Sequence, residues 1–345
     1  MGNPSTVLHI ALLVACLACG NALATPSSAP SVPDRARTGA ALAPLRALLS
    51  TPEGQIDFAD AKLTIDRLID PLIDAHAVLL EIERLTDTVK ARTPAGISRR
   101  GQLEVLLSTL YEAGPWNGNR PFTYDLQDPL GKDRRNKLLS TYLSTRKGNC
   151  VSMPILVAII GQRLGLYVTL ATAPQHVLAK FVDDQGRWLN VEATAGGFKY
   201  DSSYERETGI SELAIQNQIY LRPLSPREAV GVMASPLMEY YAAHKRGDEL
   251  MAAADMVLAV SPKDTVAIIQ KANAYYLQLQ QRYVSRYPKS EDIPSAMRAD
   301  FQRLSHENLA WFEKAEQLGW TPKTPAQEQK YLQSIQREKA RRGQL

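Results

Sequence analysis

The sequence has few cysteines and histidines, three and five respectively among 345 residues. Cys16 and Cys19 lie in an apolar N-terminal stretch, so Cys150 is the single cysteine of the remaining chain. One thiol cannot form an intramolecular disulfide, and neither paired cysteines nor closely spaced histidines suggest a structural zinc site. We therefore expect no disulfide framework, no metal and no cofactor.

An excess of charge of one sign is also absent. Forty Lys and Arg residues against 36 Asp and Glu residues give a formal net charge of +4, and no more than two basic residues are consecutive. We therefore expect no binding of nucleic acid. The 45% hydrophobic and 22% charged composition is typical of a globular protein that buries a core.

The apolar run Val7 to Cys19 is too short to span a bilayer as a stable helix and leads into small residues, which is typical of a secretory signal over residues 1–24. Two processing routes fit. Ala22-Leu23-Ala24 has the A-x-A form of a signal peptidase site, whereas Leu13-Val14-Ala15-Cys16 resembles a bacterial lipobox, in which Cys16 would be lipidated. Because no Lys or Arg precedes the run, a misassigned start or an uncleaved anchor is the alternative. We expect an exported protein, either periplasmic or tethered to a membrane as a lipoprotein.

The rest of the chain divides by composition and hydrophobic pattern. The proline pair in Arg222-Pro223-Leu224-Ser225-Pro226 marks the expected boundary before a helical C-terminal third. We predict a flexible leader at 25–44, a mixed domain at 45–222, a helical region at 223–325 and a polar, basic tail at 326–345.

The mixed domain is predicted to be α+β. N-terminal helices start at Phe58, at Asp70-Pro71 as a cap followed by proline, and near Arg100, and a loop covers 116–133. The run 153–160 is apolar all round and, with Gln162, Arg163 and a closing Gly165, predicts a buried central helix. Three β-rich segments follow at 167–172, 176–182 and 187–193 and predict a small antiparallel sheet. The face predicted for the helix after Asp70 comprises Leu72, Ala75, Leu79, Ile82 and Val89.

Cys150 stands directly before the predicted central helix, in Gly148-Asn149-Cys150. A thiol at a helix N-terminus faces unpaired backbone N–H groups and the positive end of the helix dipole, which favour the nucleophilic thiolate. The basic pair Arg146-Lys147 acts in the same direction. Taken alone, however, Cys150 is equally open to interpretation as a buried, inert cysteine.

His176 and Glu192 follow Cys150 in the order nucleophile, base, acid. If residues 184–186 form a three-residue hairpin loop, Asp183 pairs with Arg187, and Glu192 then lies on the same sheet face as His176, one diagonal step away. Asn190 lies on that face too and is an alternative orienting group. A two- or four-residue loop would separate the pair.

These motifs carry a family resemblance. Gly148-Asn149-Cys150 at a helix start, a later Arg163-Leu164-Gly165, a strand histidine and Trp188 followed by Val191-Glu192-Ala193-Thr194 resemble the transglutaminase-like core, a relative of the papain fold. The usual acid of that family is Asp followed by Pro, where this chain has Glu192-Ala193. A bacterial branch with tetratricopeptide-like helices after the core is similar over most of 63–322. Helical segments around 253–260, 274–275 and 308–315 resemble such repeats, and a plain helical bundle is the alternative.

The resemblance implies a catalytic triad of Cys150, His176 and Glu192, with Asn190 as the other candidate for the orienting role. It implies a cysteine hydrolase or acyltransferase that acts on protein or peptide amides, with the helical repeats contacting a protein partner. The alternative is an inactive peptide-binding or scaffold protein that uses the same cleft.

Overall fold

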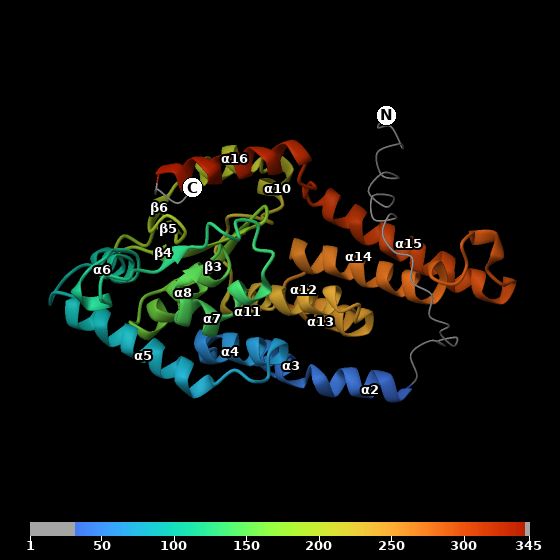
Figure 1. The fold of residues 1–345 in the computed structure, drawn as a ribbon, viewed down its shortest axis with the longest axis horizontal. Coiled ribbons are helices and arrows are strands. Elements are labelled where there is room, and N and C mark those ends of the chain that lie inside the picture. The colour runs from blue at the N-terminus through green and yellow to red at the C-terminus, as the bar shows by residue number, and fades with distance from the viewer. Residues whose placement is uncertain (1–31, 342–345) are drawn as a thin grey trace.

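The computed structural model describes residues 32–341, in which a small sheet lies among helices that continue beyond it toward the C-terminus (Figure 1). The helices before the sheet are α2 (Val32–Ala41), α3 (Ala43–Ser50), α4 (Phe58–Ile69), α5 (Ala75–Arg92), α6 (Arg99–Tyr111), α7 (Leu139–Thr145) and α8 (Ser152–Arg163). Those after it are α9 (Asp201–Thr208), α10 (Glu212–Gln216), α11 (Pro226–Met233), α12 (Ser235–Ala243), α13 (Gly247–Val260), α14 (Thr265–Leu279), α15 (Ser295–Gln317) and α16 (Pro325–Arg341).

Four antiparallel strands form the sheet in the order β3-β4-β5-β6. They are β3 (Val168–Ala173), β4 (His176–Val182), β5 (Trp188–Glu192) and β6 (Gly197–Lys199). Two further strands, β1 (Thr123–Tyr124) and β2 (Lys147–Gly148), pair in parallel within the loops that precede α8. The α+β prediction is confirmed, and β1, β2 and β6 were not predicted.

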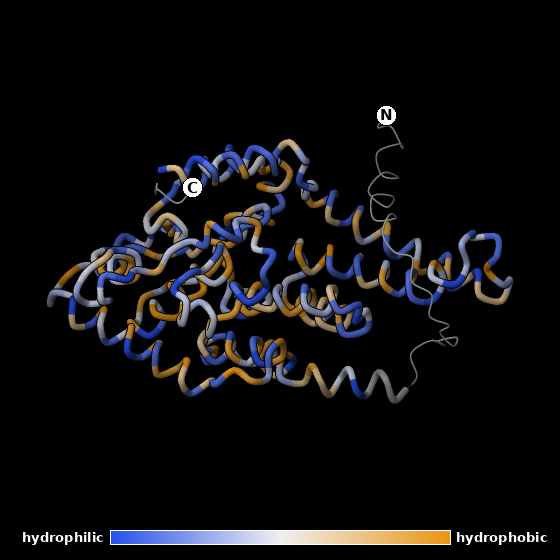
Figure 2. The backbone as a smooth tube through the Cα atoms, viewed as in Figure 1, coloured by the Kyte–Doolittle hydropathy of each residue, from blue (hydrophilic) through white to orange (hydrophobic). Residues whose placement is uncertain are grey.

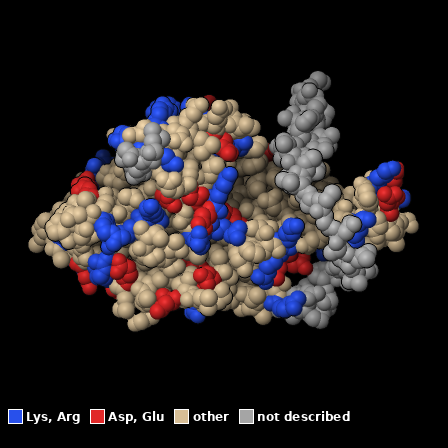
Figure 3. All heavy atoms as spheres, viewed as in Figure 1, with Lys and Arg blue, Asp and Glu red and all other residues tan. Residues whose placement is uncertain are grey.

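The helix α8 is the centre of the core. Its residues 152–161 are all buried, as expected of a helix that is apolar on every side. It packs on one face of the sheet, where alternate residues of β3, β4 and β5 join the main cluster. In Figure 2, hydrophobic and hydrophilic residues alternate along the helices around the sheet. On the face in view, positive and negative side chains are interspersed (Figure 3).

The other face of the sheet carries a second apolar cluster. Ala171, Ala173 and Leu178 from β3 and β4 pack there with Tyr204 of α9. The segment from Ala214 to Leu221 completes the cluster, and Leu318 and Trp320 from the chain after α15 lie against it. The sheet is thus covered by α8 on one side and by α9, α10 and part of the C-terminal chain on the other.

The C-terminal helices extend to one side of the sheet, and α16 turns back along it (Figure 1). Helices α13 and α14 pack against each other, and α15 packs along α14. The boundary predicted after residue 222 is not a break in packing, because Leu224 N–H donates to the Leu170 carbonyl and α11 contributes to the main cluster. The repeat character of these helices stays a prediction.

Two local expectations were wrong. Residues 32–44 of the predicted flexible leader are largely helical, and Leu42 is fully buried because it packs in the main cluster. Asp70 ends α4, and α5 begins after Asp74, whose carboxylate accepts from Ala77 N. Leu72 consequently lies outside the helix and is 92% exposed. The predicted signal at 1–24, with Cys16, lies outside the described residues. None of the helices between residues 32 and 341 is long and apolar enough to cross a membrane.

Close packing of α8 on β3 predicts the effect of Gly161→Ala. A Cβ at Gly161 would lie 2.6 Å from Cγ2 of Val168, a stiff side chain that cannot swing away. This overlap outweighs the gain in helix propensity, so the free energy of unfolding should fall by about 1–2 kcal/mol. Urea denaturation measures it. Gly54→Ala is the control, because a Cβ at Gly54 meets nothing within 4 Å. A Gly161→Ala variant as stable as the control would contradict this packing.

Candidate active site

Cys150 lies between β2 and α8, and the preceding residue Asn149 caps the helix. The Asn149 side-chain oxygen accepts from Val151 N at 2.9 Å and Ser152 N at 3.2 Å, and its carbonyl accepts from Met153 N. From the sequence, unpaired N–H groups were expected to face the thiol. Those of Val151 and Ser152 are already paired, so the helix dipole acts on Cys150 through a capped terminus. Among the described residues, the Cys150 N–H itself has no hydrogen-bond partner.

Gly148 is required just before the cysteine. A Cβ there would lie 2.5 Å from the buried Tyr142 ring and 2.8 Å from the Ser152 hydroxyl. The pairing of β1 with β2 holds this approach in place, because Asp125 N donates to the Gly148 carbonyl at 2.8 Å. Arg146 does not point its charge at the thiol as expected. Its guanidinium donates to the carbonyls of Asn117 and Arg120 in the preceding loop.

The Cys150 side chain reaches the turn between β3 and β4. Ala173 pairs with His176, so only Pro174 and Gln175 form the turn. Gln175 has a φ of 56°, a left-handed conformation that is unusual for a residue other than glycine. The Cys150 thiol donates to the Gln175 carbonyl at 3.8 Å, which places the thiol beside the residue that follows, His176.

The β4–β5 register brings His176 and Glu192 together. Lys180 pairs with Asn190, and Asp183 N donates to the Arg187 carbonyl across a three-residue loop with Gly186 at φ 75°. This is the predicted register. His176 Nε2 lies 2.9 Å from Glu192 Oε2, and the His176 side chain is 19% exposed.

Glu192 is fixed by two further residues. Its Oε1 accepts from the Thr194 hydroxyl at 2.6 Å and from Thr194 N at 3.2 Å, and its Oε2 accepts from the Tyr204 hydroxyl at 2.7 Å. Tyr204 was not among the site residues predicted from the sequence. The signal available in the sequence was that Tyr204 is the only apolar residue of the polar helix α9. In the structure Tyr204 is 1% exposed. With both oxygens held, the longer side chain of glutamate has one defined position.

Asn190 does not take the orienting role in this structure. Its side-chain amide donates to the Lys199 carbonyl at 3.0 Å and to Asp201 at 2.6 Å. Asp201 also pairs with the nearly buried Lys180. The partner of His176 is therefore Glu192, and Asn190 connects β5 to the start of α9.

The electrostatics of the pair favour charge on both partners. Burial lowers the pKa of His176, but hydrogen bonds to Cys150 and Glu192 and the charges of both residues outweigh it and raise this pKa to about 10. Burial raises the pKa of Glu192, whereas the bonds from His176, Thr194 and Tyr204 lower it more, to about 2. An imidazolium beside a carboxylate is therefore the expected form near neutral pH.

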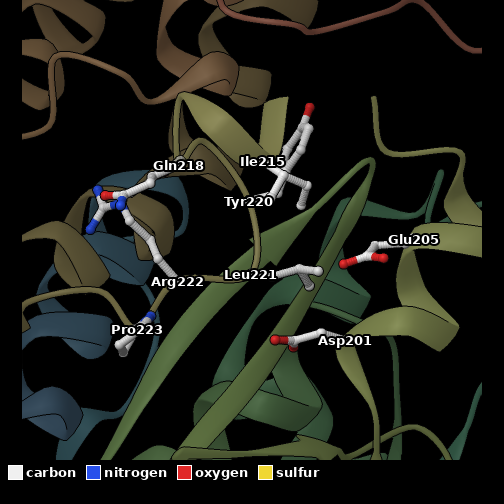
Figure 4. Close-up of a pocket in the computed structure, with 8 residues that line it drawn as sticks. All are labelled: Asp201, Glu205, Ile215, Gln218, Tyr220, Leu221, Arg222 and Pro223. Atoms are coloured by element: carbon white, nitrogen blue, oxygen red, sulfur yellow. The ribbon is translucent and has the colours of Figure 1, made fainter. Parts of the chain in front are cut away.

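A separate hollow lies between α9 and residues 215–223 and does not include Cys150, His176 or Glu192. In Figure 4, Asp201 and Glu205 from α9 lie opposite Leu221, with Gln218 and Arg222 on the far side. Since Asp201 is engaged by Lys180 and Asn190, we assign no chemistry to the hollow. Within residues 32–341, no group of three or more His, Cys, Asp or Glu residues is placed to hold a metal ion.

Comparison with known proteins gives one family match and two relatives. The model of the Transglutaminase-like superfamily matches residues 76–234, which hold Cys150, His176 and Glu192. This part of the chain is a transglutaminase-like domain. Two relatives, both named UPF0162 protein and from the Temecula1 and 9a5c strains of Xylella fastidiosa, are each 26% identical over 51% of this chain and 67% of their own length. No solved structure matched the chain.

The His176–Glu192 pair predicts a pH dependence of stability in the transglutaminase-like domain. Because folding raises the pKa of His176 from 6.5 to about 10, its contribution is complete below pH 6.5 and is lost as pH rises toward 10. Folding lowers the pKa of Glu192 from 4.5 to about 2, so its contribution is lost as pH falls through that interval. The stability difference between wild type and His176→Gln should therefore shrink from pH 6.5 to pH 10 in urea titrations. A difference that stays constant or grows would contradict the charged pair.

Proposed function

We propose that the transglutaminase-like domain is a cysteine hydrolase or acyltransferase that acts on protein or peptide amide groups. The observation that carries the proposal is the alignment of three side chains from distant positions. Cys150 at the start of α8 lies beside His176, and His176 Nε2 lies 2.9 Å from Glu192, which is held by two further donors. A nucleophile, a base and an orienting carboxylate in this relation fit covalent catalysis.

The reaction proceeds in two steps. The Cys150 thiolate attacks the amide carbonyl carbon, and the tetrahedral intermediate collapses to a thioester as the C–N bond breaks. The His176 imidazolium gives its proton to the leaving ammonia or amine. Water or a second amine then attacks the thioester, His176 accepts a proton from it, and the thiolate leaves. Glu192 stays ionised and holds the ring through Nε2.

The backbone supplies one donor for the oxyanion. The Cys150 N–H, which has no partner within the described part of the chain, is placed to bond the developing oxygen charge. Because Asn149 satisfies the next two N–H groups, the Cys150 N–H is the one left at this helix start.

The setting of the domain is part of the proposal. We propose that the chain is exported, with either signal cleavage after Ala24 or lipidation at Cys16, and that the C-terminal helices contact a protein partner as tetratricopeptide-like repeats do. The inactive binding or scaffold protein is the competing function, and the activity test below distinguishes the two.

Replacement of the nucleophile tests the proposal. Full-length wild type and Cys150→Ala are incubated with unfolded casein, with and without an added primary amine, and the products are followed by mass spectrometry. Proteolysis, deamidation and amine transfer change the substrate mass in different ways. Loss of the nucleophile should reduce the active reaction by at least about a thousandfold.

Cys19→Ala is the matched control, since it removes a thiol outside the domain and should keep full activity. Activity that survives in Cys150→Ala would exclude Cys150 as the nucleophile. If wild type and Cys150→Ala are both inactive on every protein and peptide substrate offered, the binding or scaffold function is favoured instead.

A further inference from the structure

The chain that follows α15 is anchored on the outer side of the sheet. Ser211 donates its hydroxyl to the Gly319 carbonyl at 2.9 Å, and the Asn217 amide donates to the Leu318 carbonyl at 3.2 Å. Gly319 has a φ of 99°, and a Cβ there would lie 2.4 Å from Ala214 N. Trp320 packs against the second apolar cluster. The turn that leads into α16 is therefore fixed.

From this turn, α16 runs back along the end of the molecule that carries β6 and α10 (Figure 1). Its Tyr331 hydroxyl donates to the Pro129 carbonyl at 2.8 Å and lies 2.9 Å from the Tyr124 hydroxyl. Tyr124 also bonds the Pro129 carbonyl, at 2.9 Å. Tyr124 belongs to β1 and pairs with Gly148, two residues before Cys150. Tyr331 thus contacts the loop that contains Pro129, which follows the strand paired with Gly148.

The charges of Cys150 and Glu192 both act on the Tyr331 hydroxyl. Burial raises the pKa of Tyr331, the bond with Tyr124 lowers it, and the charges of Cys150 and Glu192 raise it further. Cys150 and Glu192 both interact with the His176 side chain. The Tyr124 pKa is likewise raised by burial and, in part, by the charge on Cys150. Together with the bonds of Tyr331 to Tyr124 and Pro129 and the pairing of Tyr124 with Gly148, this puts both tyrosines beside the strand that leads into Cys150.

The helix itself is lightly held. Between residues 325 and 341, Ile335 is the one buried side chain, and most of the others are exposed. Tyr331, Ile335 and an exposed bond of 3.5 Å from Lys339 Nζ to Gln127 Oε1 hold this helix. So few contacts let it detach at a small free-energy cost, while the anchored turn at Leu318–Trp320 stays in place as its hinge.

We infer that α16 covers the substrate-binding surface beside Cys150, and that a polypeptide substrate reaches the thiol only when α16 is displaced. The inference rests on the proposed function, because it assigns the covered surface to substrate. The cover is itself a polypeptide segment, which seats a tyrosine hydroxyl on the Pro129 carbonyl and an apolar side chain one turn later. The surface therefore fits a protein chain better than a small metabolite.

Size-selective labelling of the thiol tests the inference in the full-length chain. Rates of Cys150 modification are measured by peptide mass spectrometry with iodoacetamide, which is small, and with a maleimide carrying a long polyethylene glycol chain, which is bulky. Ile335→Arg puts a charge on the buried side of α16 and should release it. Gln333→Arg adds the same charge on the exposed side of the same helix and is the matched control.

Ile335→Arg should raise the bulky maleimide rate about tenfold over wild type and Gln333→Arg, while the iodoacetamide rate changes by less than about twofold. Tyr331→Phe, which removes one hydroxyl and leaves the ring, should raise the bulky rate by a smaller factor. Equal bulky rates in all four proteins would overturn the inference, and so would an equal rise for both reagents. Labelling requires no turnover. A size-selective rise in a chain without amide chemistry would therefore support the cover and refute the proposed function.

Discussion

The register of β4 against β5 is the constraint on which the candidate site depends. Side chains alternate across a strand, so a shift of one residue would move Glu192 to the opposite face from His176. The hairpin loop prevents that shift. Asp183 accepts from the backbone N–H groups of Gln185 and Arg187, and Gly186 takes the left-handed conformation that closes a three-residue loop. Asp184 in the same loop accepts from Arg99 N at the start of α6, which ties the loop to the helices.

Features that depend on short stretches of sequence were predictable. The loop and its register follow from four residues, and the burial of α8 follows from an unbroken apolar run. The start of α5 was misplaced because Asp70-Pro71 and Asp74 both carry cap signals, and only packing decides between them. Tyr204 was missed because its role depends on a carboxylate on a different element. The prediction of unpaired N–H groups at Cys150 failed because Asn149 folds back onto its own helix.

The position of the C-terminal helix could not be predicted either, because its contacts are distant in the sequence. Its composition predicted a polar, basic tail, and in the structure residues 325–341 form α16, most of which is exposed. Its position depends on Tyr331 and Ile335, and Tyr331 bonds a carbonyl that lies about two hundred residues earlier in the chain. Composition cannot reveal such a contact. Through Tyr331, α16 thus contacts the loop and strand that precede Cys150.

The proposed function requires His176 to activate Cys150. The most direct measurement is the iodoacetamide rate at Cys150 at about pH 6, where an ordinary cysteine is almost wholly protonated, compared between the folded chain, the urea-unfolded chain and the folded His176→Gln variant. If His176 holds Cys150 in its reactive form, the rate should be at least about tenfold higher in the folded wild type than in the other two. Equal rates in folded and unfolded chains, or a high rate that survives in His176→Gln, would contradict it.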